Sequence, residues 1–390
     1  MPDWDLFTRE AGPRYSLGPA VPIVSVKAIR RHLGVSTAIA VTPYSAAASA
    51  WLGKGRGISV HRDGREEFAG QIVQRRITWD AENARFLITV QCAGDEQVLA
   101  DRLVFPDPLR APDDQTVNDY WQRTAPASTA MLQLISDQAG PTCHADRQVT
   151  GLIIGEDPGV GTPRKYRALF TDVMTTLGTI SVASKTGLGV RVAPTGAGLR
   201  ASLYVPRDLR DTVRFSTELG NLLGFDYTET GPTVTDALAA GQGDLHLRLR
   251  RLVSSTSTDV AAWGRRIWTY LDRRDTSDAA DLIQDATDQV ADGTPTVSLA
   301  VTLTDSQAVR YGRDWGLGDM VTVYVGGPDQ TSVATVADVV REVYLEVTET
   351  GAESIRPAIG TDDATAVIPS PTQQALAAVG RRLSSLETRK

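Results

Sequence analysis

The chain has 390 residues, 42% of them hydrophobic, and a formal net charge of −7. This length is long for one hydrophobic core, so we expect two to four domains, and the acidic balance argues against a polyanion such as nucleic acid as a main partner. Only two cysteines, Cys92 and Cys143, are present, which excludes a disulfide framework and a cysteine-only zinc site.

The first block, residues 1–112, is predicted to be a β-barrel-like domain. Asp63 and Gly64 lie between two strand-like runs and predict a type I′ hairpin turn, because both central residues of that turn need a positive φ. A polar turn at 79–84 precedes apolar residues that alternate from Phe86 to Cys92, which predicts a strand with one buried face. Cys92 is therefore expected in the core.

Residues 113–207 are predicted to form a small α/β domain. Ser128 is expected to cap a helix, and a second helix is expected to stop at Gly178. The apolar positions of these two helices are Met131, Leu132, Leu134 and Ile135 in the first, and Leu169, Phe170, Val173, Met174 and Leu177 in the second. Short strands are predicted at 180–184, 190–193 and 201–205.

Residues 208–253 and 294–360 are predicted to form a second β-barrel-like domain, split by a helical insertion at 254–293. The insertion combines an aromatic-rich stretch with an acidic helix whose apolar side carries Leu282, Ile283, Ala286 and Val290. The strands expected in this domain are 221–228, 245–250, 296–303, 320–325 and 340–347. In 245–250 the alternation places three leucines inside and His246, Arg248 and Arg250 outside.

The chain ends with a predicted linker, 361–371, and a predicted helix, 372–390, which starts after Ser370-Pro371. Its apolar positions are Leu376, Val379, Leu383 and Leu386. Their 3-4-3 spacing matches the a and d positions of a coiled coil, so this seam is predicted to be an oligomer interface. Two heptads are too few to hold helices together alone, and a helix folded back on its own chain fits the pattern equally well.

Several stretches together resemble the hub-like tail-tip or baseplate proteins of non-contractile phages that infect actinobacteria. They are Asp101-Arg102-Leu103-Val104-Phe105-Pro106-Asp107-Pro108, residues 147–161 with Gly151-Leu152, Val213-Arg214-Phe215-Ser216 followed by Gly220-Asn221-Leu222, and residues 316–323. The resemblance is spread over nearly the whole chain. It implies an α+β, mainly β fold, with two barrel-like domains, a small α/β domain between them and a helical insertion in the second barrel.

The resemblance also implies a function. Two similar barrels in each subunit of a homotrimer would present six near-equivalent surfaces, which would join a sixfold tail tube to a threefold tip. The implied partners are a distal tail protein ring, a tape-measure protein and a downstream tip or receptor-binding protein, with nucleic acid only passing through the lumen. The implied location is the tail tip of a virion, which is assembled in the host cytoplasm and takes part in host attachment and genome ejection. No secretory leader or membrane-spanning run is recognisable.

No enzyme motif, cofactor site or metal site is recognisable, so the protein is not expected to be an enzyme. A dyad of Cys143 and His144 is disfavoured because adjacent residues rarely aim at one substrate atom. The acidic pairs Glu66-Glu67, Asp113-Asp114 and Asp362-Asp363 could serve a tail-associated cell-wall lysin, but adjacent carboxylates do not predict the facing arrangement that glycoside hydrolysis needs.

A carbohydrate-binding tail adhesin is the main alternative function. The tryptophans that could stack on sugars are Trp51, Trp79, Trp121, Trp263, Trp268 and Trp315, although such residues are more often core or interface anchors. The basic residues Arg75, Arg76, Arg248, Arg250 and Arg251 could line a DNA channel. An exposed strand face or an intersubunit ion pair is the favoured interpretation of these arginines.

Overall fold

The computed structural model describes residues 3–10, 15–196, 198–303, 309–326 and 332–360. These residues form two compact units. The first comprises the described residues up to Gly224 together with Val301–Ala358, and the second comprises Phe225–Ala300 and the last described residues, 359–360. The strands Leu222–Thr230 (β14) and Thr296–Leu303 (β18) carry the chain into the second unit and back.

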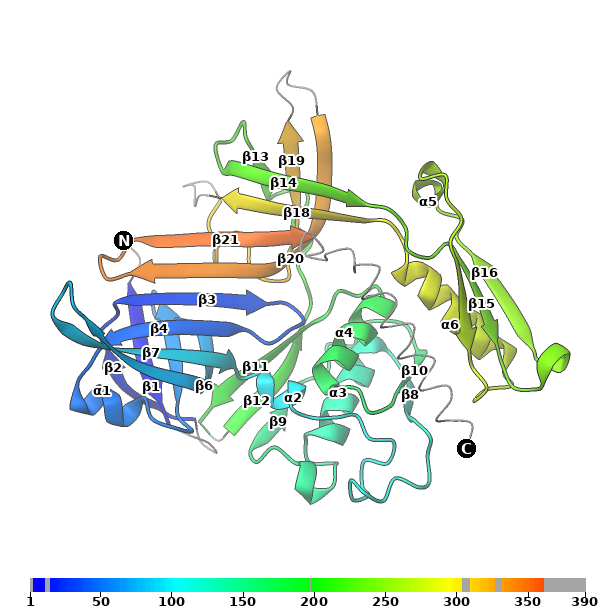
Figure 1. The fold of residues 1–390 in the computed structure, drawn as a ribbon, viewed down its shortest axis with the longest axis horizontal. Coiled ribbons are helices and arrows are strands. Elements are labelled where there is room, and N and C mark those ends of the chain that lie inside the picture. The colour runs from blue at the N-terminus through cyan, green and yellow to red at the C-terminus, as the bar shows by residue number, and fades with distance from the viewer. Residues whose placement is uncertain (1–2, 11–14, 197, 304–308, 327–331, 361–390) are drawn as a thin grey trace. The chain divides into compact units, whose positions relative to one another are not determined.

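The first unit is built around one large sheet. Its strands lie in the order β21-β20-β3-β4-β7-β6-β5-β1-β2, while β19 pairs with β20 and β13 pairs with β19 (Figure 1). The bounds are Trp4–Arg9 (β1), Leu17–Val21 (β2), Ser25–Arg31 (β3), Thr37–Pro43 (β4), Gly57–Arg62 (β5), Arg65–Asp80 (β6), Arg85–Gly94 (β7), Arg214–Ser216 (β13), Met320–Gly326 (β19), Ser332–Thr348 (β20) and Glu353–Gly360 (β21). The short helix Ala46–Trp51 (α1) lies between β4 and β5 in the sequence, and the short helix Gln97–Ala100 (α2) follows β7.

One long strand joins the start and the end of the chain in this sheet. In β20, residues 332–339 pair with β19 and residues 342–348 pair with β3, both antiparallel. The mainly β class is therefore confirmed, but none of the described sheets closes into a barrel, and the two barrel-like domains are not confirmed. Alternation in a sequence shows which face of a strand is buried, but it does not show which strands are neighbours.

The β5–β6 hairpin agrees with the sequence analysis. Asp63 and Gly64 have φ values of +51° and +74°, as a type I′ turn requires. After the next turn, Ile88, Val90 and Cys92 are buried on one face of β7, as predicted. This hairpin and β7 fix the register of the first half of the sheet.

The middle of the first unit is a small α/β region around its own core. Helices α3 and α4 pack against each other and close this core together with two small sheets, β10-β8 and β11-β12-β9. The bounds are Trp121–Ala125 (β8), Ala127–Gln138 (α3), Ala145–Arg147 (η1, a 3₁₀ helix), Leu152–Ile154 (β9), Arg164–Ala168 (β10), Val173–Ala183 (α4), Gly189–Thr195 (β11) and Gly198–Tyr204 (β12).

Both helices differ from their predicted bounds. Ser128 lies inside α3, where its hydroxyl donates to Asp157 at 2.5 Å and accepts from the Val160 amide, and Pro126 is the N-cap residue. Helix α4 starts later than predicted because the Asp172 carboxylate caps it by accepting from an amide. It then continues through Gly178, since an interior glycine costs only about 1 kcal/mol, so the predicted strand 180–184 is helical.

The second unit contains a three-stranded sheet with one helix on it. The strands lie in the order β16-β15-β17, and α6 packs against β15 and β16 (Figure 1). The bounds are Asp236–Ala240 (β15), Leu245–Leu247 (η2, a 3₁₀ helix), Arg250–Ser254 (β16), Thr258–Ala262 (α5), Trp268–Asp272 (β17) and Ala279–Asp292 (α6). The acidic helix is confirmed: Leu282, Ala286 and Val290 are buried, while Ile283 is exposed.

The predicted strand 245–250 is wrong. Residues 245–247 form the 3₁₀ turn η2, and Leu247 is exposed. Arg248 folds back to donate to the carbonyls of Ala240 and Gly241, at 2.7 and 2.8 Å, so the chain turns here before β16 begins. The predicted linker 361–371 and helix 372–390 lie outside the described residues, and the predicted domain boundaries stay a prediction.

Candidate functional site

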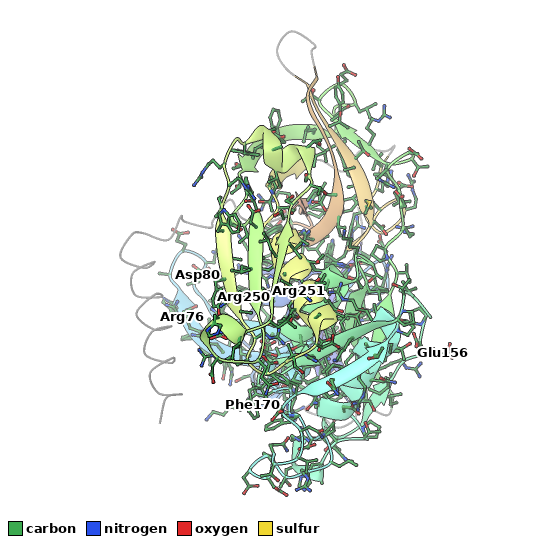
Figure 2. All side chains as sticks on the ribbon, turned by 90° about the vertical axis from the view of Figure 1, so that its right-hand side faces the viewer. Arg76, Asp80, Glu156, Phe170, Arg250 and Arg251 are labelled. Carbon is green, nitrogen blue, oxygen red and sulfur yellow. The ribbon has the colours of Figure 1, made fainter. Side chains whose placement is uncertain are left out.

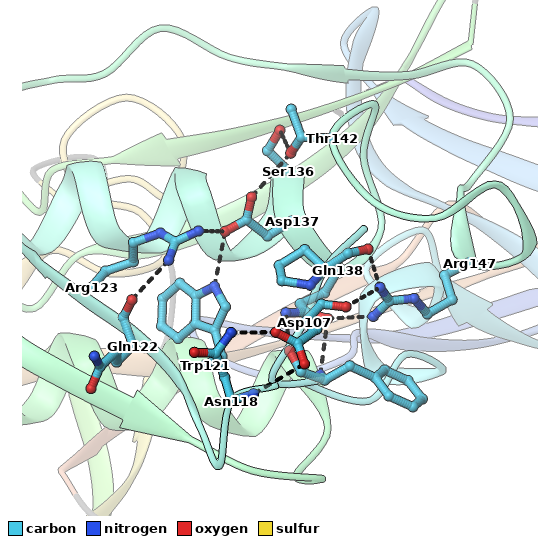
Figure 3. Close-up of polar contacts among 12 residues, drawn as sticks. Asp107, Asn118, Trp121, Gln122, Arg123, Ser136, Asp137, Gln138, Thr142 and Arg147 are labelled. Atoms are coloured by element: carbon cyan, nitrogen blue, oxygen red, sulfur yellow. Dashed lines mark hydrogen bonds and ion pairs between the residues drawn. The ribbon is translucent and has the colours of Figure 1, made fainter. Parts of the chain in front are cut away.

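A buried arginine in the middle region connects two of the stretches that carry the family resemblance. Arg147 donates to the Gln138 side chain at 2.9 Å and to the carbonyls of Asp107 and Pro108, and its guanidinium lies over the ring of Phe105 (Figure 3). The stretch 101–108 is therefore held against α3 and η1. These contacts organise a loop.

A second polar cluster lies beside it on α3. The Asp137 carboxylate accepts from the indole of Trp121 at 2.9 Å, from Arg123 at 2.7 Å and from Thr142 at 3.1 Å (Figure 3). Nearby, the Asp107 carboxylate accepts from Asn118 and from two backbone amides, which keep the pKa of Asp107 below its usual value against the effect of burial. Each carboxylate accepts three hydrogen bonds, which hold neighbouring segments of the chain together, as in a structural cluster.

The other two stretches of the resemblance also contain internal anchors. Asp319 accepts from the Gly316 amide at 2.8 Å and pairs with Arg207. The Asn221 side chain accepts from the Ser216 amide at 2.9 Å and donates to the carbonyl of Arg214. Residues in the stretches that carry the family resemblance thus form hydrogen bonds that stabilise turns and strand ends.

The first unit contains a polar pocket of about 370 Å³ lined from β3, β6, β11, β12 and the loop 311–319. At its centre, Arg30 donates to Glu67 at 2.6 Å, and the hydroxyl of Tyr311 also donates to Glu67, at 2.8 Å. Burial and the neighbouring Glu67 raise the pKa of Tyr311, although Arg30 opposes this. Tyr311 therefore stays protonated and serves as a hydrogen-bond donor.

Glu96 lines the same pocket and differs from its other acids, because its Oε2 atom is buried without a hydrogen-bond partner among the described residues. Burial raises the pKa of Glu96 to about 7. The folded protein thus binds this proton more tightly than the unfolded chain, so stability falls as pH rises from about 4.5, and the full loss is reached above about 7.

We therefore expect Glu96→Gln to stabilise the protein at pH 8 but not at pH 4.5. The expected gain at pH 8 is about 2–3 kcal/mol, because the substitution removes the need to ionise a buried carboxyl. Urea unfolding of both proteins at several pH values between 4.5 and 8 measures this difference. A stability difference that does not change with pH would contradict the assignment.

The described catalytic candidates are not assembled into a reactive group. The thiol of Cys143 donates to the carbonyl of Gly140 at 3.2 Å, and burial raises its pKa, while the His144 ring accepts from the Asp146 amide. Glu67 forms an ion pair with Arg30 and accepts a hydrogen bond from Tyr311 in the polar pocket. Asp114 pairs with Arg110 on the surface. The pair Asp362-Asp363 lies outside the described residues.

The basic candidates have intramolecular contacts of their own. Arg75 donates to the Ser49 hydroxyl, and Arg248 pairs with Asp272 at 2.5 Å. Figure 2 labels Arg76 on β6 and, in the second unit, Arg250 and Arg251 on β16. Arg75 and Arg76 belong to the first unit, whereas Arg248, Arg250 and Arg251 belong to the second.

The tryptophans divide into core and surface residues. Trp121 and Trp315 are buried in the first unit, and Trp51 is half-buried under the guanidinium of Arg56. By contrast, Trp79, Trp263 and Trp268 are exposed. Only these last three could contact a partner through a large part of the ring.

An apolar surface lies on the β6–β7 hairpin. Ile77 pairs with Ile88 and Trp79 pairs with Phe86, so these side chains share the face that is buried farther along β7. Ile88 is buried, but Trp79 and Phe86 are each 53% exposed, because the hairpin extends past the core. The ring centroids of Trp79 and Phe86 lie 4.8 Å apart, and the ring of Tyr44 packs edge-on against Phe86. We call Tyr44, Val73, Ile77, Trp79 and Phe86 the hairpin surface.

The backbone next to this surface is also available. Strand β5 pairs with β6 only as far as Gln71, so among the described strands residues 73–80 of β6 pair with β7 alone. A groove of about 810 Å³ runs between residues 53–55 and residues 72–77 of β6. An unpaired strand edge that carries apolar side chains is a typical place for another chain to bind.

The second unit presents a different apolar surface. One face of its sheet is covered by α6, and the other face carries a central row of Leu252, Leu238 and Tyr270 with Trp268 beside it. Leu252, Trp268 and Tyr270 are 49%, 56% and 54% exposed. We call this the open face of the second unit.

Comparisons with known proteins place the fold among phage tail proteins. The model of the family described as "Siphovirus ReqiPepy6 Gp37-like protein" matches residues 22–361. A tail protein from Neisseria meningitidis MC58 is similar with a TM-score of 0.56 and 13% identity, over 92% of this chain and 97% of that one. The 43 kDa tail protein of prophage MuSo2 from Shewanella oneidensis gives 0.54 and 11%, over 91% and 98% of the two chains.

Prophage tail protein gp18 from Listeria monocytogenes EGD-e is similar with a TM-score of 0.50 and 12% identity, over 97% of this chain and 99% of that one. No curated protein sequence matches the chain. Within the described residues, no helix is long and apolar enough to cross a membrane, and no group of three or more His, Cys, Asp or Glu side chains could hold a metal ion.

Proposed function

Because the chain belongs to the Siphovirus ReqiPepy6 Gp37-like family, we propose that it is the structural hub of a phage tail tip. In this proposal three copies form a ring that joins the sixfold tail tube to the tip or to receptor-binding parts. The observation that carries the proposal is the similarity in fold to two tail proteins over more than nine-tenths of both chains. The described residues support a structural role, since their polar clusters brace loops.

The proposed partners are a distal tail protein ring, a tape-measure protein and a downstream tip or receptor-binding protein. The genome would pass through the lumen of the ring without being bound by it. Such a joint needs rigid subunits and surfaces that fit other subunits, and does not need a tuned catalytic pocket. The seam Leu376, Val379, Leu383 and Leu386 is part of this proposal as an oligomer contact.

Electron microscopy of the purified protein tests the symmetry directly. Averaged end-on views should show a ring with threefold symmetry and an open centre. Rings with another symmetry, or single subunits at every concentration, would contradict the hub.

The hairpin surface is the second proposed contact between copies, and it gives a prediction. We expect the double substitution Trp79→Ser and Phe86→Ser to raise the concentration at which the ring half dissociates by at least about tenfold, which corresponds to about 1.4 kcal/mol. Exposed aromatic anchors contribute strongly to interfaces, whereas truncating residues exposed in the free subunit has little effect on its own stability. Sedimentation velocity across a dilution series measures the change.

The matched control is Leu109→Ser, because Leu109 is the most exposed large apolar side chain of the described residues and lies away from the hairpin. This control should leave the assembly unchanged. If both variants weakened the assembly equally, the effect would come from the added surface polarity in general. That result would contradict a contact between copies at the hairpin surface.

A carbohydrate-binding adhesin is the second candidate, favoured by the exposed rings of Trp263, Trp268 and Tyr270. Binding of the purified protein to host cells or to wall polysaccharide would support it, and a bare hub should show neither. A cell-wall lysin is the third candidate, for which zymography against host cell wall is the test.

A further inference from the structure

The open face of the second unit needs a cover that the described residues of its own unit do not supply. In an ordinary α/β layer both faces of a sheet are buried, but here α6 covers one face and the row Leu252, Leu238 and Tyr270 on the other is only partly shielded. Large apolar side chains gathered on an exposed face mark a binding surface.

The polar groups around the open face are engaged with one another. At one end Arg266 pairs with Asp236, which also accepts from Ser254 at 2.6 Å. At the other end Arg248 pairs with Asp272 and donates to the Tyr270 hydroxyl at 2.8 Å. The charges at both ends thus hold the aromatic side chains in place and offer little to the hydroxyls of a sugar. An apolar occupant fits this face better than a polar ligand.

The size of the face limits what can bind there. Its three strands have five residues each, so it measures about 16 Å along the strands and about 15 Å across, an area of about 250 Å². A stable interface between two globular proteins needs about 800 Å² from each partner. The open face is therefore too small to join two subunits alone, but it is wide enough for one α-helix, which is about 10–12 Å in diameter.

The sequence predicts a helix of matching length at 372–390. Its apolar stripe from Leu376 to Leu386 covers eleven residues, a rise of about 15 Å, which is close to the length of the strands. The stripe is too short to hold a coiled coil on its own, so it needs a preformed apolar surface. The predicted linker 361–371 can reach at most about 40 Å from β21, which allows the helix to leave its own subunit.

We propose that the helix 372–390 of one copy packs on the open face of the second unit of the neighbouring copy. This inference rests on the proposed ring, and it names the surface that receives the seam. Each copy gives a helix to one neighbour and receives one from the other. Such a head-to-tail contact closes after three copies, and each small contact benefits from the high effective concentration inside the ring.

The test is site-directed cross-linking of the full-length protein. Leu252→Cys and Leu383→Cys are introduced into separate copies, which are co-expressed and treated with a short bis-maleimide. The native thiols of Cys92 and Cys143 are buried and should react slowly. The expected product is a cross-link between residue 252 of one copy and residue 383 of another, identified by peptide mass spectrometry.

The matched control replaces Leu383→Cys by Arg381→Cys, on the opposite side of the predicted helix. The 252–381 product should be at least tenfold weaker than the 252–383 product. Cross-links between two 383 positions would indicate a coiled coil. In a further variant that carries Leu252→Cys and Leu383→Cys in the same chain, 252–383 links confined to one chain would indicate a helix folded back on its own subunit. Either result overturns the proposal.

Light scattering on the same samples separates the two proposals. A mass of three chains without the 252–383 product overturns the docking of the helix and leaves the hub intact, whereas a monomer overturns both. Quenching of Trp268 fluorescence by wall polysaccharide, absent in a Trp268→Phe variant, would assign the open face to a sugar and would also overturn the docking.

Discussion

Replacing Arg9 by glutamine is expected to lower the free energy of unfolding by about 3–5 kcal/mol, because it leaves a buried carboxylate without its partner. Arg9 in β1 and Asp95 after β7 are both buried, and two guanidinium nitrogens each lie 2.6 Å from a carboxylate oxygen. The pair joins two strands of the large sheet that are not neighbours. Urea unfolding followed by circular dichroism measures the loss.

Two controls show whether the loss comes from the unpaired charge. The double substitution Arg9→Met and Asp95→Leu should recover a large part of it, since well-packed apolar residues often replace a buried ion pair at little cost. Glu346→Gln, which breaks the more exposed pair with Lys27, should cost less than about 1 kcal/mol. A double variant that is less stable than Arg9→Gln would contradict this explanation.

The second large effect is expected at Arg147. The variant Arg147→Met keeps much of the apolar stem but leaves the carbonyls of Asp107 and Pro108 without this donor, and we expect a loss of about 3 kcal/mol. The loop 101–119 should also exchange its amide hydrogens faster, because its link to α3 is lost. Urea unfolding and hydrogen exchange measure the two effects.

The control for Arg147 is Arg123→Met. Arg123 also contacts a carboxylate on α3, that of Asp137, but its side chain is 39% exposed, so its loss should cost less than about 1 kcal/mol. Equal effects of the two variants would mean that burial of Arg147 does not matter, which would contradict the anchoring role assigned to it.

Sequence patterns predict a local element well when the apolar periodicity and the conformational preferences of its residues favour the same structure. Asp63-Gly64 gave the turn and its backbone angles, and the alternation in β7 gave the buried face of Cys92. The predictions failed where a long-range contact decided the structure. Residues 245–250 alternate like a strand, yet the hydrogen bonds of Arg248 to the chain before β16 favour a turn.

The pairing of the strands could not be predicted from the same patterns. The alternation in β20 correctly predicts that Val343, Leu345 and Val347 share a buried face. It does not reveal that the other half of the strand pairs with β19, or that β3 is the neighbour of this half. The contacts that merge the expected barrels into one sheet connect residues about 300 positions apart, for which a single sequence has no local signal.

The candidate surfaces were predicted only in part. The tryptophans of both surfaces, Trp79 and Trp268, were singled out as possible anchors, but their exposure was not foreseen. A signal for the hairpin surface was present, because the apolar alternation of β6 continues to Trp79, next to the polar turn. For the open face the signal was weaker. The aromatic-rich stretch of the insertion marks its aromatic residues, but β16 and β17 are short, and an inner and an outer face look alike in sequence.

Absolute mass by size-exclusion chromatography with light scattering, over a range of concentrations, tests the hub most directly. We expect the mass of three chains of 41.9 kDa, which falls when Leu376, Val379, Leu383 and Leu386 are changed to polar residues. Three chains without a fall would keep the hub and remove the C-terminal helix from the interface. A monomer at every concentration would contradict the self-assembling ring and favour the adhesin.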